Sequence, residues 1–114
     1  MVAVNACLHQ LFEAQAERTP DAPALVFEGT KLSYAELERR ANHVAAQLVR
    51  LGVGPDVAVG LHLERSAEMI VGILGILKAG GAYLPIDPAF PPERVAYLLS
   101  DSNAAVLLTN AKLH

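Results

Sequence analysis

The chain has 114 residues, of which 53% are hydrophobic, and a formal net charge of −3. Its charges are mixed in sign and lack the basic stripe that nucleic-acid binding requires, and its longest apolar run, residues 69–77, is too short to span a bilayer. The single cysteine, Cys7, excludes an intrachain disulfide and no secretory signal is visible, so we expect a cytoplasmic protein that binds neither nucleic acid nor membrane.

The first part of the sequence predicts a helix followed by a small hairpin. Apolar positions within residues 8–16 follow a helical spacing, and Pro20 ends this segment. Residues 24–27 and 31–32 are expected to form two paired strands, joined by a turn at 28–30.

A long amphipathic helix is predicted next. Ser33 is expected to cap its start, with Glu36 completing a capping box, and Gly52 is expected to end it. Its apolar positions are separated by three or four residues and predict one continuous face toward a core: Tyr34, Leu37, Ala41, Val44, Leu48 and Leu51.

Beyond this helix the pattern alternates between strands and helices. Strands are predicted at 57–63, 83–86 and 105–108, with helices at 66–78 and 92–101 between them. Such alternation is typical of parallel strands joined by helical crossovers. The expected fold class is therefore α/β, with a mainly parallel sheet beside an N-terminal helix and a small hairpin.

The helix at 66–78 is apolar on nearly all sides, so we expect several elements to cover it. Gly72 and Gly75 are interpreted as packing positions that let neighbours approach closely. Lys78 lies in the last turn, where the helix dipole favours a cation, and Gly80 or Gly81 is expected to supply the left-handed residue that stops the helix.

Functional groups in open α/β sheets are expected at the carboxyl ends of the strands. Arg65 and Ser66 follow the first predicted strand, and Asp87 follows the second. Ser66 at a helix N-terminus could hold an anion beside Arg65, and Asp87 could orient a ribose or a metal. A helix cap and a turn are the favoured interpretations of Ser66 and Asp87.

Other patterns fail on spacing. Residues 52–54 lack the third glycine of a dinucleotide-binding loop, and no phosphate-binding loop sequence is present. The histidines have no metal-ligand spacing: His9, His43, His62 and His114. Cys7 has no recognisable base nearby in the sequence, and Ser33 is better explained as a cap than as a nucleophile.

Three segments resemble parts of a known enzyme family. Residues 77–88, with the sequence LKAGGAYLPIDP, resemble the second core motif of the amino-acid adenylation domains of nonribosomal peptide synthetases. Residues 32–37, LSYAEL, resemble the first core motif, and residues 8–25 are similar to the usual start of such a domain. These domains belong to the adenylate-forming, AMP-binding enzymes, which include acyl-CoA ligases and luciferases.

The resemblance implies activation of an amino acid with ATP and magnesium to an aminoacyl adenylate, release of pyrophosphate, and transfer to the phosphopantetheine thiol of a carrier domain. In the family the phosphate loop, the ribose-binding and pocket aspartates and the mobile lysine lie downstream of the matching motifs. No catalytic, cofactor-binding or metal-binding residue is therefore carried over onto this sequence.

We accordingly expect residues 1–114 to be the incomplete N-terminal part of an adenylation domain, inactive and without a cofactor when alone. Its partners would be the rest of that domain and neighbouring carrier or condensation domains. The apolar content is above the usual, so we also expect an exposed apolar patch of more than a few hundred Å² and possible self-association.

Two alternatives stay open. The segment would be an interaction module if its apolar faces dock in a split or domain-swapped assembly. It would be an independent small-ligand domain if it bound phosphate or a nucleotide at the Ser66 helix end and lost affinity when Arg65 is replaced. The sequence does not identify the amino acid that a parent enzyme activates.

Overall fold

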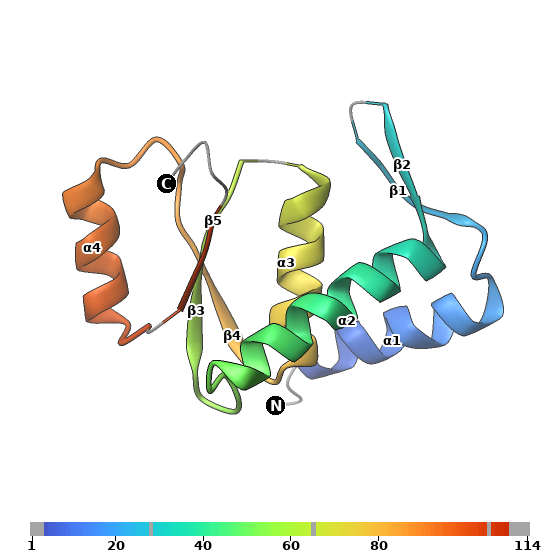
Figure 1. The fold of residues 1–114 in the computed structure, drawn as a ribbon, viewed down its shortest axis with the longest axis horizontal. Helices are drawn as coiled ribbons and strands as arrows, with labels where there is room; N and C mark the ends of the chain where they lie inside the picture. Colours follow the sequence, from blue (N-terminus) through green and yellow to red (C-terminus); the bar gives the residue numbers. More distant parts are fainter. Residues whose placement is uncertain (1–3, 28, 65, 105, 110–114) are drawn as a thin grey trace.

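A computed structural model describes residues 4–27, 29–64, 66–104 and 106–109. The elements follow in the predicted order (Figure 1): α1 (Val4–Arg18), β1 (Pro23–Phe27), β2 (Thr30–Ser33), α2 (Tyr34–Arg50), β3 (Ala58–His62), α3 (Ala67–Lys78), β4 (Ala82–Pro85), α4 (Pro92–Asp101) and β5 (Val106–Thr109). Most predicted boundaries agree to within one or two residues. The predicted first residue of the last strand, 105, lies outside the described residues.

Two separate sheets are present in the described part of the chain. Strands β1 and β2 form the expected antiparallel hairpin. Strands β3, β4 and β5 form a parallel sheet in the order β4-β3-β5, in which Val59 of β3 is paired with Tyr83 on one side and Val106 on the other. The prediction of an α/β fold with parallel strands is confirmed.

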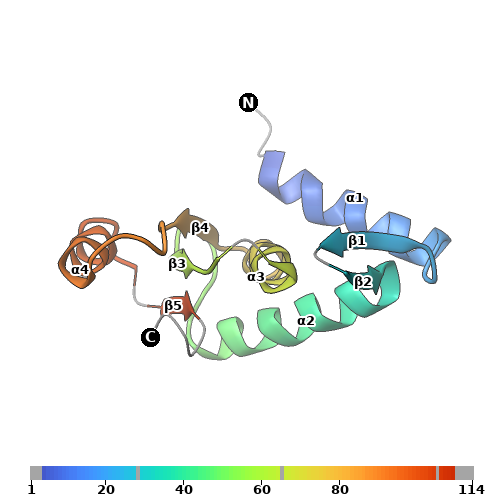
Figure 2. The same cartoon turned by 90° about the horizontal axis from the view of Figure 1, so that it is seen from above.

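Helices cover both faces of the parallel sheet. Figure 2 shows α3 and α4 on opposite sides of it, with α1 and α2 on the same side as α3. A side chain added at Gly60 would meet Leu99 of α4, whereas one added at Gly72 of α3 would meet Leu61 of β3. Alternate residues of β3 therefore point to the two helices, as the geometry of a strand requires.

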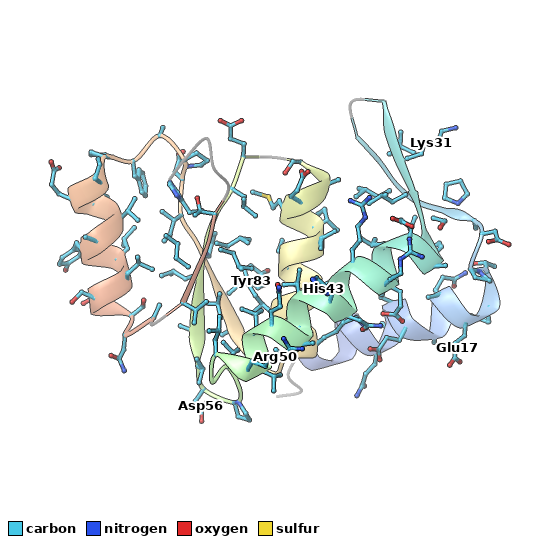
Figure 3. All side chains as sticks on the ribbon, viewed as in Figure 1. Glu17, Lys31, His43, Arg50, Asp56 and Tyr83 are labelled. Carbon is cyan, nitrogen blue, oxygen red and sulfur yellow. The ribbon has the colours of Figure 1, made fainter. Side chains whose placement is uncertain are left out.

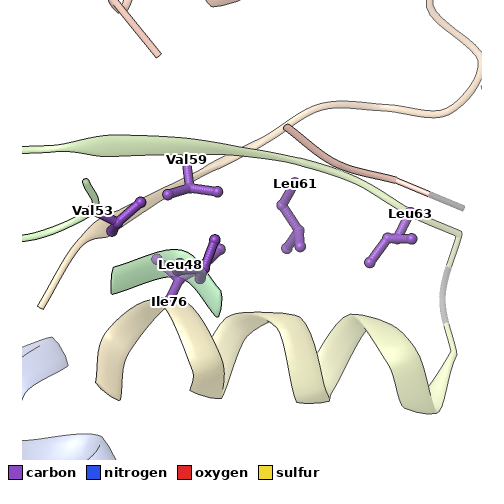
Figure 4. Packing of buried hydrophobic residues seen from close by; sticks show 6 residues of the cluster. All are labelled: Leu48, Val53, Val59, Leu61, Leu63 and Ile76. Carbon is purple, nitrogen blue, oxygen red and sulfur yellow. The ribbon is translucent and has the colours of Figure 1, made fainter. Parts of the chain in front are cut away.

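The core lies between α3, α2 and the parallel sheet. Its buried cluster is shown in Figure 4 and consists of Leu48, Val53, Val59, Leu61, Leu63 and Ile76. A second cluster lies beneath the hairpin and consists of Leu32, Leu37, Ala67 and Val71. Both clusters include residues of α3, so the expectation that several elements cover this helix is confirmed.

The two glycines of α3 allow close approach by its neighbours. A Cβ at Gly72 would lie 3.0 Å from Leu61 Cδ1, and one at Gly75 would lie 2.6 Å from Val44 Cγ1. The second distance is too short for a real contact, so α2 and α3 pack at a separation that only glycine permits there. The interpretation of both residues as packing positions is confirmed.

The predicted helix ends are confirmed in most respects. Ser33 Oγ accepts a hydrogen bond from the Glu36 N–H at 3.1 Å. At the end of α3, Gly80 has a φ of 86°, its N–H donates to the Leu77 carbonyl, and the Gly81 N–H donates to the Ile76 carbonyl, each at 3.0 Å. This pair of bonds is a Schellman motif, in which the left-handed residue is Gly80.

Two details of the α2 prediction were wrong. The Glu36 carboxylate does not complete a capping box, because it pairs with Arg40 at 2.9 Å and with Arg39 on the same helix. Leu51 is not on the buried face: it is the C-cap residue, and it is 65% exposed. The chain leaves the helical path here, toward Gly52 with a φ of 93°, so the apolar face ends at Leu48.

Within the described residues, no helix has both the length and the apolar character needed to cross a membrane.

Candidate functional site

The carboxyl ends of three parallel strands meet at one edge of the sheet, where the sequence predicts functional groups. Strand β3 ends at His62, β4 at Pro85 and β5 at Thr109. Figure 3 shows the side chains in relation to these strands. Of the predicted candidates near this edge, Ser66 and Asp87 are described, whereas Arg65 lies outside the described residues.

Ser66 makes the contacts of a helix cap. Its Oγ accepts a hydrogen bond from the Met69 N–H at 3.2 Å and donates one to the Glu64 carbonyl at 2.9 Å. The hydroxyl proton is thus already used, and one acceptor position is occupied by the helix itself. The favoured interpretation of Ser66 as an N-cap residue is confirmed.

Asp87 makes the contacts of a turn. Its Oδ1 accepts a hydrogen bond from the Ala89 N–H at 2.9 Å, and its carbonyl accepts one from the Phe90 N–H at 3.0 Å. An aspartate that bonds to the backbone two residues later forms an Asx turn. The structure therefore confirms the turn interpretation of Asp87, whose side chain is exposed.

His62 is the buried polar group that the sequence reasoning missed, because it was considered only as a metal ligand. It ends the central strand and is 7% exposed. Its Nδ1 lies 3.3 Å from Thr109 Oγ1, so the pair joins the ends of β3 and β5, and Nε2 has no hydrogen-bond partner in the described part of the chain. The sequence feature that could have identified His62 is a single polar residue within the apolar sequence of a predicted strand.

Lys78 is a buried cation, which its position near a helix end did not predict. Its side chain is 5% exposed and forms ion pairs with Glu13 of α1 and Glu38 of α2. One lysine therefore joins three helices. Because the ammonium group already contacts two carboxylates, it is not placed to hold a phosphate.

Two largely apolar grooves lie along the parallel sheet. One, of about 430 Å³, runs beside β4 and is lined by residues that include Met69, Ile73 and Tyr83. The other, of about 200 Å³, lies between α2, α3 and β5 and is lined by Arg40, Val44, Leu63, Glu68, Val71, Gly72, Leu108 and Thr109.

The polar side chains described above are engaged in local contacts. Ser66 and Asp87 bond to nearby backbone, and Lys78 contacts two carboxylates. No group of three or more potential metal ligands occurs within residues 4–27, 29–64, 66–104 and 106–109. The described residues form capped helices that pack closely on a sheet.

Comparisons with known proteins identify relatives along almost the entire chain. The family model described as AMP-binding enzyme matches residues 12–114. Tyrocidine synthase 3 from Brevibacillus parabrevis is 58% identical over 111 residues, which are 97% of this chain and 2% of that protein. The chain thus spans a small fraction of this curated relative.

Solved structures show the same fold. The nonribosomal peptide synthetase FmoA3 with bound AMPPNP is 47% identical, with a TM-score of 0.89 over 94% of this chain and 12% of that chain. A second FmoA3 structure, with alpha-methyl-L-serine-AMP bound, has a TM-score of 0.88 at 47% identity and covers 93% of this chain and 12% of that chain.

Proposed function

Because the chain belongs to the AMP-binding enzyme family, we propose that residues 1–114 are the N-terminal part of an amino-acid adenylation domain of a nonribosomal peptide synthetase. The observation that carries the proposal is the match to FmoA3, which covers 94% of this chain but 12% of that chain. The matched family region includes both segments that resemble the core motifs of adenylation domains.

The complete domain would activate an amino acid with ATP and magnesium to an aminoacyl adenylate and pass it to the phosphopantetheine thiol of a carrier domain. Support comes from the FmoA3 structures, one with AMPPNP and one with an aminoacyl adenylate. The proposed partners are the rest of the adenylation domain and the neighbouring carrier or condensation domains.

In this proposal the described residues contribute framework and no reacting group. Capping by Ser33 and Ser66, the Schellman motif at Gly80 and the ion pairs of Lys78 fix α2 and α3 against the sheet. Such a framework would hold downstream loops in place, and accurate positioning of reacting groups is a large part of enzyme catalysis.

Amino-acid-dependent exchange between ATP and pyrophosphate tests the proposal. The complete parent domain should catalyse exchange with at least one amino acid, and the 114-residue chain should not exceed the background measured without amino acid. A complete domain that exchanges with none of the amino acids tested, or an active 114-residue chain, would contradict the proposal.

The alternative of a split or domain-swapped interaction module is favoured by one observation. Large apolar side chains are exposed on several elements, among them Leu11 of α1, Val26 of β1 and Tyr97 of α4. Light scattering separates the two functions: a monodisperse monomer at high concentration that binds no apolar dye would count against docking through such faces.

A further inference from the structure

We propose that α1 is a releasable strap, which is hinged at residues 19–22 and fastened to the rest of the fold by the ion pair of Glu13 with Lys78. When the strap is released, α1 leaves α2 and α3 and loses its helical structure, while the other helices and the sheet stay in place. This conformational device is separate from the proposed function, because it depends only on contacts among described residues.

The apolar contacts of α1 are few, although it lies against both α2 and α3 (Figure 1). Of its side chains that the structure describes, Ala16 alone is buried, whereas α2 and α3 contribute four and six buried residues. Phe12 is partly buried beside Tyr34, with ring centroids 5.7 Å apart, and Leu11 is 67% exposed. Because hydrophobic stabilisation grows with the apolar area removed from water, it contributes little to the docking of α1.

The ion pair between Glu13 and Lys78 is the main polar link of α1. Among the ion pairs and side-chain hydrogen bonds of the described residues, it is the one that joins α1 to another helix. The Lys78 side chain is 5% exposed, and attraction between charges is stronger where water is largely excluded. We infer that this pair supplies a large share of the free energy that docks α1.

Release of α1 does not leave Lys78 without a counter-charge. Glu38 of α2 contacts the same ammonium group and would remain beside it when Glu13 leaves. An uncompensated buried charge is strongly destabilising, so this second carboxylate preserves the packing of α2 on α3. The Glu13 side chain is already 43% exposed, and its return to water carries little penalty.

The turn that follows α1 is tied to the start of α2 and forms the hinge. The Tyr34 N–H donates to the Ala22 carbonyl at 3.0 Å, and the Ala35 N–H donates to the Pro20 carbonyl at 2.9 Å. Both bonds lie outside α1 and do not depend on Glu13. The helix would therefore swing about residues 19–22, and its N-terminal part would move furthest.

The helix should melt when it is released. It has 15 residues, and isolated helices of about 12–15 residues are marginal in water. Its backbone hydrogen bonds would therefore open together with its docking contacts. Amide hydrogen exchange reports such local opening, so the amides of residues 10–18 measure release of the strap.

Exchange in the 114-residue chain is compared with exchange in Glu13→Ala and Glu17→Ala. Glu17 is exposed and lies one turn further along α1, and it has no ion pair with a described residue. Glu13→Ala should speed exchange of the α1 amides by about tenfold, as for the loss of a hydrogen bond between charged groups, and leave α2 and α3 unchanged. Glu17→Ala should not speed it. Alanine raises helix propensity at both positions, so a weaker helix cannot explain faster exchange.

Unchanged α1 exchange in Glu13→Ala, or equal acceleration by Glu17→Ala, would overturn the inference. So would a Glu13→Ala protein in which α2 and α3 accelerate as much as α1, because the helix would then not open separately.

Exchange of the unsubstituted chain at low urea concentrations gives a second measurement. The α1 amides should exchange faster than those of α2 and respond less to urea, because local opening exposes less surface than global unfolding. If the amides of both helices share one opening with the same urea dependence, α1 is released only when the whole fold is lost, and the inference fails.

Discussion

Lys78 on α3 and Glu38 on α2 form an ion pair in which the lysine side chain is almost fully buried. Glu13 of α1 contacts the same ammonium group, so the pair is the centre of a triad across three helices. Lys78 also belongs to the segment that resembles the second core motif of adenylation domains. The triad gives this lysine a structural role within the proposed framework.

Removal of the buried cation should destabilise the fold. Lys78→Met leaves Glu38 and Glu13 facing each other without a counter-charge, and we expect a loss of about 3 kcal/mol, the low end for broken buried pairs because both carboxylates are partly exposed. Lys31 is exposed on β2, so Lys31→Met should change the free energy of unfolding by less than about 0.5 kcal/mol. Urea unfolding measures both, and equal effects would show that the triad contributes nothing.

The close packing of α2 on α3 predicts a penalty for enlarging Gly75. Gly75→Ala places a Cβ 2.6 Å from Val44 Cγ1, and we expect a net loss of about 1–2 kcal/mol after the gain in helix propensity is subtracted. Adding Val44→Ala should make the cost of Gly75→Ala smaller. Gly54→Ala is the control, since a Cβ there meets nothing within 4 Å. A Gly75→Ala protein as stable as the parent would disprove the tight contact.

Replacement of Ser66 distinguishes a helix cap from an anion site. Ser66→Ala removes the acceptor for the Met69 N–H and should cost about 1 kcal/mol in thermal or urea unfolding, whereas Ser66→Asp should retain most of the stability. Phosphate titration followed by NMR is the second measurement. If Ser66 is only a helix cap, no saturable phosphate binding is expected. Saturable phosphate binding that is lost in Ser66→Asp would show that this helix end also binds an anion.

We expect the Glu36 carboxylate to give the free energy of unfolding a small dependence on pH. Its hydrogen bond from Arg40, together with the charge of Arg39, lowers its pKa below the ordinary value of 4.5. A carboxyl whose pKa is lowered by folding contributes stability above its unfolded pKa, and that contribution is lost as the pH falls below about 4.5 and through the folded value.

Glu36→Gln should therefore lower stability at pH 7 and have less effect at the acid end of this range. Because the carboxylate is on the surface, added salt should reduce the difference at pH 7. Urea unfolding at a series of pH values checks the sign, and a Glu36→Gln effect that grows toward acid pH would contradict it.

The order of helices and strands could be predicted because each element carries its own periodicity and punctuation. Ser33, Ser66 and Gly80 act through backbone groups within a few residues of themselves, which is why their roles were readable. Leu51 fits the same spacing, yet it lies one residue beyond the end of α2. A pattern of apolar positions does not define the residue at which the backbone leaves the helix.

Contacts between residues distant in sequence could not be predicted. Lys78 forms an ion pair with Glu13, which lies sixty-five positions away in the sequence, and His62 contacts Thr109, which lies forty-seven positions away. Both pairings depend on how α1 docks and on the order of the strands in the sheet. The sequence predicted Lys78 only as a cation at a helix end and considered His62 only for metal binding, whereas tertiary packing determines their partners.

Equilibrium binding of AMPPNP, measured by titration calorimetry with magnesium, tests the central claim most directly. If residues 1–114 are framework and the ATP site lies in the polypeptide that follows, the 114-residue chain should show no saturable binding, and the complete domain should bind. Saturable binding by the 114-residue chain with an affinity close to that of the complete domain would contradict the account.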